Sequence, residues 1–119
     1  MKLNFDAMRE LLFVIEEQPR DIDVNKVVFD ARLEHFDKEE LGYAIEKLIE
    51  SNLLNGRVGR TKTGTVFLIS SISFEGHRFL ENIRQDTVWN KAKETASQVG
   101  ATTIRELGSI VISSVKELF

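Results

Sequence analysis

The sequence predicts an α+β fold that is mostly α, a winged helix-turn-helix with a short β-hairpin wing and additional C-terminal helices. Residues 38–51 have the periodicity of an amphipathic helix, residues 53–70 read as a hairpin, and three cations gather at the hairpin tip. A helix leading into such a hairpin is the second half of a winged helix. We therefore expect a winged-helix domain over residues 1–85. Residues 86–119 are expected as a helical extension that packs on this domain or on an oligomer partner.

The helix over residues 38–51 is predicted from one apolar stripe with i, i+3, i+4, i+7, i+8 spacing. The stripe comprises Leu41, Ala44, Ile45, Leu48 and Ile49. Asp37 stands at the N-cap position, and Glu40 three residues later completes a capping box. Upstream, Asn4 caps a helix over residues 5–18 that Pro19 ends, and the apolar run 11–15 indicates burial on most sides.

Residues 20–36 leave two interpretations open. Asp21 to Asp23 read as a short extended segment, the small first strand of a winged helix. Residues 24–36 fit a short helix, but the run from Val27 to Phe29 fits a strand equally well. The expected fold favours the helix because a helix-turn-helix needs an element before residue 37.

The hairpin is predicted to have a polar turn over residues 59–64 and a second strand over residues 65–70. Val66 and Leu68 point to one face of this strand, and Phe67 and Ile69 to the other. Because both faces are apolar, we expect the strand to be covered on both sides or to meet a partner on one of them.

Three helices are predicted after the hairpin. Ser73 caps one over residues 74–84, and Gly100 ends one over residues 86–99 whose apolar side includes Val99. A capping box from Thr103 to Glu106 opens the last helix, although the run 110–112 is also compatible with a strand. One face of this last helix forms a predicted protein interface, with packing on the domain's own core as the alternative. The interface candidates are Ile104, Leu107, Val111 and Leu118, together with Trp89 as a packing anchor or binding hot spot.

The composition excludes several classes of protein. The 119 residues include no cysteine, which excludes disulfides and thiolate chemistry, and the net charge of −3 is not that of a general nucleic-acid binder. No apolar run is long enough to span a membrane, and early charges do not fit a secretory leader. We expect a cytoplasmic protein with no membrane partner.

The sequence offers five candidate nucleic-acid contacts. Arg57, Arg60 and Lys62 lie in the hairpin with no acid among them, and Tyr43 and Lys47 lie off the apolar stripe of the preceding helix. Residues 37–50, however, contain five acids against two bases, which opposes phosphate attraction. The basic hairpin therefore suggests duplex DNA as a partner, while the acidic helix argues against it.

No group of residues predicts catalysis. His35 and His77 have no further ligands at metal-site spacing, and no nucleophile motif is present. The glycines at 59 and 64 have the spacing of a phosphate-binding loop, but Thr65 and Val66 replace its Lys-Ser/Thr pair. We therefore expect no enzyme activity, no cofactor, no metal and no small-molecule substrate.

Residues 76–84 and 88–94 resemble the C-terminal half of the domain of unknown function 2513, a family with a YjcQ-like relative that is common in phages and prophages of Gram-positive bacteria. The specific part is Gly-His-x-Phe-Leu from Gly76 with Trp89 downstream, and residues 1–4 and 48–54 are similar too. Ser73 stands where the family usually has Thr, and Tyr43-Ala44 replaces a Tyr-His pair. The resemblance implies a winged-helix-like core and a mobile-element context, and it implies no activity.

Two functions are compatible with these features. The first is a phage-related, non-enzymatic protein-interaction or self-association module, with a second copy or a host protein as its partner. The alternative is a DNA-binding accessory transcriptional regulator that uses the basic wing. The acidic balance over residues 37–50 favours the first function.

Overall fold

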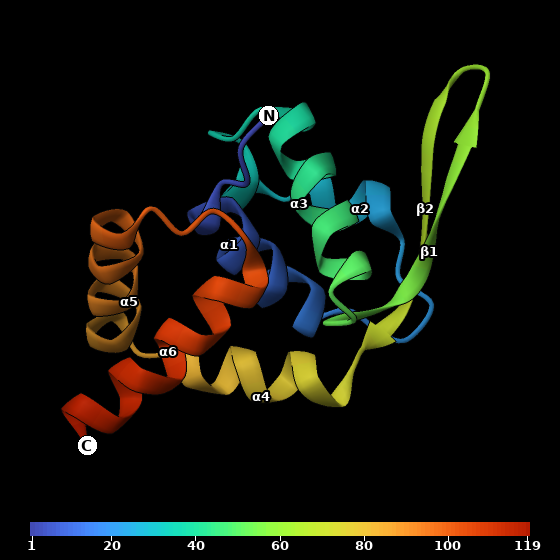
Figure 1. Ribbon diagram of the computed structural model, residues 1–119. Helices are drawn as coiled ribbons and strands as arrows, with labels where there is room; N and C mark the ends of the chain where they lie inside the picture. Colours follow the sequence, from blue (N-terminus) through green and yellow to red (C-terminus); the bar gives the residue numbers. More distant parts are fainter.

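The computed structural model describes all residues, 1–119, and has the predicted α+β, mostly α class. Figure 1 shows the helices gathered around α1, with the outer part of the hairpin projecting away from them. The elements in chain order are α1 (Phe5–Glu16), α2 (Val24–Val28), the 3-10 turn η1 (Ala31–Leu33), α3 (Lys38–Glu50), β1 (Leu54–Thr61), β2 (Gly64–Ile72), α4 (Phe74–Ile83), α5 (Asp86–Val99) and α6 (Ile104–Leu118). None of the helices combines the length and apolar character needed to cross a bilayer.

One hydrophobic core unites the chain. Helix α1 lies within it, with residues 7, 8, 11, 12, 14 and 15 all buried, which confirms the burial expected from its wide apolar face. The same cluster includes Trp89 of α5 and Leu107 and Val111 of α6. Residues 86–119 therefore share their core with residues 1–85.

The structure resolves the ambiguous segment before residue 37. Ile22 forms an isolated antiparallel bridge with Ile69, and its N–H donates to the Ile69 carbonyl oxygen at 2.8 Å. The next residues form α2 and η1, so the strand is not formed and the helical interpretation is correct in part. The helix ends at Val28, and residues 31–33 add one 3-10 turn. Asp23 caps α2 by accepting hydrogen bonds from the N–H groups of Asn25 and Lys26.

Helix α3 begins and packs as its sequence predicts. Asp37 and Glu40 form the capping box, and the apolar stripe is buried except for Ile49, which is half-buried. The helix ends at Glu50, and Asn52 then takes a left-handed backbone with φ of 63°. That reversal directs the chain into β1.

The hairpin is longer and its turn shorter than predicted. Its strands pair from Leu54 with Ile72 to Thr61 with Gly64, so Gly59 and Arg60 lie in a strand and the turn is only Lys62-Thr63. The Thr61 hydroxyl donates to the Gly64 carbonyl oxygen at 2.8 Å, which closes the tight turn. Gly64 has φ of 142°, a backbone that residues with side chains rarely adopt, so this glycine permits the shorter turn.

Only one face of the hairpin is covered. Ile69 is buried, and Phe67 packs beside Gly42 of α3, where an added Cβ would lie 3.8 Å from its ring. On the other face Val66 and Leu68 are 47% and 56% exposed. The expectation of two covered faces is therefore not met within the chain, because no helix reaches the outer side.

The last three helices have the predicted boundaries to within a residue or two. The Ser73 hydroxyl accepts from the Gly76 N–H at 2.9 Å, Gly100 ends α5 with φ of 75°, and Thr103 with Glu106 forms the capping box of α6. The alternative of a strand over residues 110–112 is thereby excluded. Val99, assigned to the apolar side of α5, is 67% exposed, because it lies in the last turn beyond the buried Ala96.

Two close contacts hold α4 in position. An added Cβ on Gly76 would lie 2.1 Å from the Leu53 carbonyl oxygen, so α4 presses against the start of the hairpin. At the other end, the buried Arg9 side chain of α1 donates to the carbonyl oxygens of Ile83 and Arg84, each at 3.0 Å. These bonds satisfy carbonyls at the C-terminal end of α4, where no helical partner remains.

Candidate functional site

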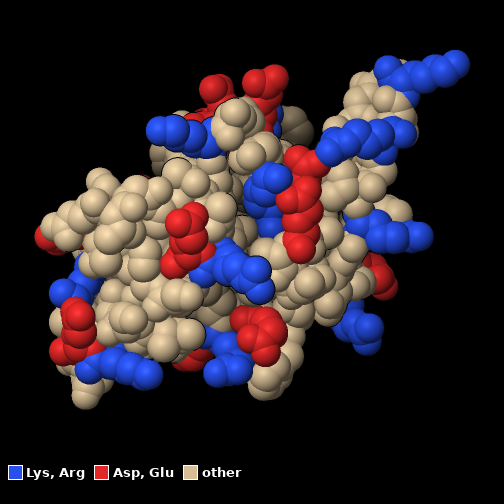
Figure 2. Space-filling view, in the orientation of Figure 1, with Lys and Arg blue, Asp and Glu red and all other residues tan.

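The three hairpin cations are exposed but do not share a surface. The strand register places Arg57 opposite Leu68 on the outer face and Arg60 opposite Thr65 on the face toward α3, while Lys62 occupies the turn. Figure 2 shows cations along the projecting hairpin. Arg60 pairs with the Glu46 carboxylate of α3, and it is the one hairpin cation with an acidic partner.

Tyr43 and Lys47 lie on another flank of α3. The Lys47 ammonium donates to Glu50 at 2.9 Å and lies 5.1 Å from the centre of the Tyr43 ring. The Glu50 hydrogen bond raises the pKa of Lys47. Both residues line a cleft with residues 1–3 and 102–105, away from the hairpin. The five candidate nucleic-acid contacts are therefore divided among the two faces of the hairpin, its turn and this flank of α3.

Most of the candidate interface residues are inside the molecule. Trp89, Ile104, Leu107 and Val111 are buried in the chain's own core, and the Trp89 indole N–H donates to the Asp6 carboxylate at 3.0 Å. Leu118 alone among the candidates is well exposed, at 43%. These four residues therefore follow the alternative expectation, packing on the domain's own core. Helices α5 and α6 bury the stripe that was expected to meet a partner.

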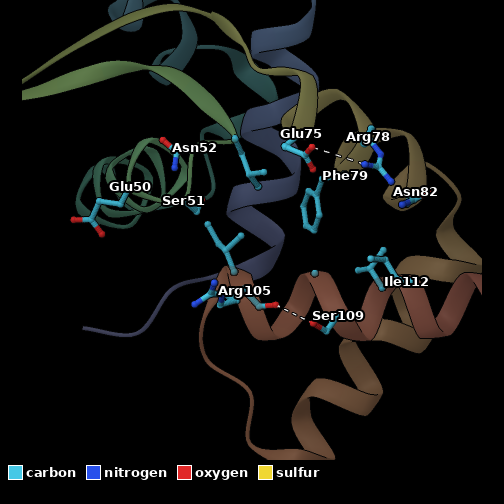
Figure 3. Close-up of a pocket in the computed structure, with 14 residues that line it drawn as sticks. Glu50, Ser51, Asn52, Glu75, Arg78, Phe79, Asn82, Arg105, Ser109 and Ile112 are labelled. Carbon is cyan, nitrogen blue, oxygen red and sulfur yellow. Dashed lines mark hydrogen bonds and ion pairs between the residues drawn. The ribbon is translucent and has the colours of Figure 1, made fainter.

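A groove of about 590 Å³ lies between α4 and α6 and is bordered at residues 50–53 by the end of α3. Each long wall is one helical face with i, i+3, i+4, i+7 spacing. The two stripes are Glu75, Arg78, Phe79 and Asn82 on α4, and Arg105, Gly108, Ser109 and Ile112 on α6. Figure 3 shows Phe79 and Ile112 directed into the space between these helices.

The groove combines an apolar floor with charged walls. Phe79 is buried beneath it, whereas Ile112 is 50% exposed. Arg78 on one wall is largely exposed and approaches Glu75 of its own helix only to 3.8 Å. Arg105 on the other wall has no acidic partner, and the only side-chain contact at this residue is the Ser109 hydroxyl bonding to its backbone oxygen at 3.5 Å. Both guanidinium groups therefore remain available to a ligand.

Gly108 leaves a position on one wall of the groove without a side chain. It lies in the middle of α6, and a Cβ added there would meet nothing within 4 Å. Glycine in a helix interior costs about 1 kcal/mol relative to alanine. Packing within the chain does not require this glycine, so its structural effect is to leave the groove open.

A second cleft of about 530 Å³ continues the groove around the start of α6. The two hollows share the lining residues Glu50, Ser51, Ile104 and Arg105. Four cationic side chains and two carboxylates line the combined hollow, in a protein with a net charge of −3. The cations are Lys2, Lys47, Arg78 and Arg105, and the carboxylates are Glu50 and Glu75.

The histidines do not lie in this groove. His35 stacks beside Phe36 with ring centres 4.1 Å apart, and His77 is exposed on α4 outside the groove. No group of three or more histidine or carboxylate side chains is close enough to hold a metal ion. The groove offers binding chemistry through apolar contact and cationic hydrogen-bond donors.

Sequence reasoning did not identify the groove. Its α4 stripe and its α6 stripe were not among the candidate sites. The signal that could have found them is a polar stripe with helical spacing beside a mid-helix glycine. Even so, the two stripes are 30 residues apart in sequence, and only the fold brings them together.

Comparisons with known proteins agree with the resemblance noted from the sequence. A relative from Haemophilus influenzae, called "Uncharacterized protein", is 28% identical over 120 residues, which cover 97% of this chain and 98% of the relative. No solved structure matches the chain. The model of the family described as "Hypothetical protein (DUF2513)" matches residues 2–102, and the chain therefore belongs to that family.

Proposed function

We propose that this protein is a non-enzymatic protein-interaction module whose partner binds in the groove between α3, α4 and α6. The observation that carries the proposal is the pairing of two helical stripes across a groove whose apolar surface is covered at Phe79 but exposed at Ile112. Ile112 is half-exposed there, and Gly108 adds no side chain to obstruct a ligand. Grooves of this kind between helices receive amphipathic polypeptides in many interaction domains.

The element order supports a winged-helix origin for the module. Helix α1, the bridge at Ile22, the helices α2 and α3, and the hairpin follow one another in the order expected of that fold. In a DNA-binding winged helix, α3 would enter the major groove. Here the exposed side of α3 carries Glu39, and its Glu46 pairs with Arg60, so the surface opposes a phosphate backbone. A phage context, implied by the family resemblance, is compatible with either role.

The proposal is tested by selecting peptides that bind the protein from a displayed library of random sequences. Binders should be lost with Gly108→Trp, which places an indole in the groove at a position where the Cβ itself meets no atom within 4 Å. Ser113→Trp is the matched control, since Ser113 is exposed on the same helix but does not line the groove. Binders that tolerate Gly108→Trp as well as Ser113→Trp would show that the groove is not the binding site.

A second candidate function is nucleic-acid binding by the hairpin. The observation that favours it is charge, because residues 54–72 contain three cations and no acid, and Arg57 and Lys62 form no ion pair. Contacts from such residues to phosphates would be independent of base sequence. The test is binding to random duplex DNA at low salt, and an absence of binding there would remove this candidate.

A further inference from the structure

The strongest further observation is the charge of the groove relative to the rest of the protein. The chain carries three more acids than bases, yet the combined hollow holds twice as many cations as carboxylates. Within the hollow, Lys47 is neutralised by Glu50 at 2.9 Å, whereas Lys2 forms no ion pair. Arg105 has no such partner, and Arg78 has only a distant one.

The dimensions of the groove limit the form of its ligand. Each wall stripe runs over eight residues, and the seven helical rises between its ends correspond to about 10 Å, or two turns. Gly108 and Ser109 are small, so a helix lying along α6 could approach its axis closely. Phe79 and Ile112 supply the apolar surface on which anchor side chains would rest.

From these features we propose that the groove binds an acidic amphipathic helix of a partner protein. The helix would place apolar residues, spaced three and four apart, over Phe79 and Ile112. Its flanking carboxylates would reach the guanidinium groups of Arg78 and Arg105, and a further acid would face Lys2 in the adjoining cleft. Arginine suits this role because its planar fork matches a carboxylate with two parallel hydrogen bonds. This inference rests on the proposed function, and it specifies the ligand of the same site.

The groove fits an acidic polypeptide better than a nucleic acid. A phosphate backbone has no apolar side chains to rest on Phe79 and Ile112. A helix with alternating apolar and acidic faces matches both the floor and the walls. The complementary charge would also increase its rate of association, and that rate would fall as salt is added.

The experiment is a selection from a library of helix-forming peptides with fixed apolar positions and, at the flanking positions, a mixture of Glu, Gln and Lys. Selection against the full chain should enrich glutamate at those positions. The variant Arg78→Glu with Arg105→Glu should instead enrich lysine, and it should bind the glutamate peptides about tenfold more weakly, the loss expected for two exposed ion pairs. The control, Lys26→Glu with Lys116→Glu, changes the net charge equally outside the groove and should keep the glutamate preference.

The outcomes separate this inference from the proposed function. Enrichment of glutamine or lysine by the unmodified chain, among binders that Gly108→Trp abolishes, would overturn the acidic helix and leave the groove as a binding site. An absence of any binder sensitive to Gly108→Trp would overturn both. Circular dichroism of each variant checks that the helices are intact. If the control variant lost the preference for glutamate as much as the Arg78→Glu with Arg105→Glu variant does, the preference would depend on net charge. That result would also refute the assignment to Arg78 and Arg105.

Discussion

The hairpin and the groove are two uncovered regions of opposite character. The hairpin projects from the body, carries only cations and exposes Val66 and Leu68 on its outer face. The groove is concave, carries both signs of charge and is floored by residues that belong to the core. Charge gathered in a single segment is visible in the sequence, whereas a hollow built from three segments is not. The hairpin, which is conspicuous in the sequence, and the groove, which is the better-formed binding surface, are therefore different parts of this molecule.

The largest expected effect is at Gly76, where α4 of the groove contacts the start of the hairpin. Gly76→Ala would place a Cβ 2.1 Å from the Leu53 carbonyl oxygen and 2.7 Å from the Ile72 side chain. A backbone carbonyl cannot rotate away, so we expect the free energy of unfolding to fall by about 3 kcal/mol, the upper part of the range for overpacking. Urea unfolding measures the change. Stability equal to the unmodified protein would mean that α4 is not held against the hairpin base.

Arg9 holds the C-terminal end of α4, the helix that forms one wall of the groove. Arg9→Met keeps an apolar stem but removes the donors to the Ile83 and Arg84 carbonyl oxygens. We expect a loss of about 2 kcal/mol in the free energy of unfolding, because two carbonyls lose a charged partner. Arg32→Met is the control, since its bonds to Glu17 and Asp30 are exposed and should contribute much less to stability. Equal losses of stability in the two variants would mean that the burial of Arg9 does not strengthen its hydrogen bonds.

The hairpin side of the comparison is tested with duplex DNA. If the protein binds DNA through its hairpin, Arg57→Ala with Lys62→Ala should reduce the slope of log affinity against log salt by about two, one for each lost phosphate contact. Arg78→Ala with Arg105→Ala removes the same charge from the groove and should leave the slope unchanged. Fluorescence anisotropy over a salt series measures both variants. An equal reduction in the two would show that net charge, rather than the hairpin, governs binding.

A smaller effect of the opposite sign is expected at Gly108. Gly108→Ala should raise the free energy of unfolding by about 1 kcal/mol, because alanine favours the helix and its Cβ meets no atom within 4 Å. Thermal unfolding at constant pH measures the gain. The contrast with Gly76→Ala is the sharpest test of the structure, since the same substitution in two helices should have opposite effects. Destabilisation at both positions would mean that the groove is closed in solution.

The smallest effect concerns the attachment of α5 to α1. Burial alone would raise the pKa of Asp6, but hydrogen bonds from Lys93 and Trp89 outweigh it and hold that pKa below its ordinary value. Because the folded pKa is the lower one, Asp6 contributes stability above about pH 4 that is lost as the pH falls through the folded pKa. Solvent screening of this exposed carboxylate limits the contribution to about 0.5 kcal/mol. Asp6→Asn should remove it, so the variant and the unmodified protein should differ at pH 7 and converge near pH 2 in urea unfolding.

Local signals predicted the elements of this protein well. Asp37 with Glu40 begins α3, Gly100 ends α5, and Thr103 with Glu106 begins α6, as expected. Each of these features depends on hydrogen bonds between residues within four positions, or on the backbone freedom of one glycine. The resemblance to the family was confirmed over residues 2–102. The hairpin turn was less well predicted, because its length depends on strand pairing rather than on the polar residues alone.

Outside residues 24–36, the sequence by itself determined where the helices begin and end, that two strands form a hairpin, and that the charged residues of the hairpin are all cations. Only the tertiary structure decided which apolar faces are covered, burying Trp89 and Leu107 while leaving Leu68 and Ile112 exposed. It also decided which cations are paired, because Arg60 meets Glu46 of another element. The physical reason is that periodicity and capping depend on near neighbours, whereas burial and ion pairing depend on which distant segment packs alongside.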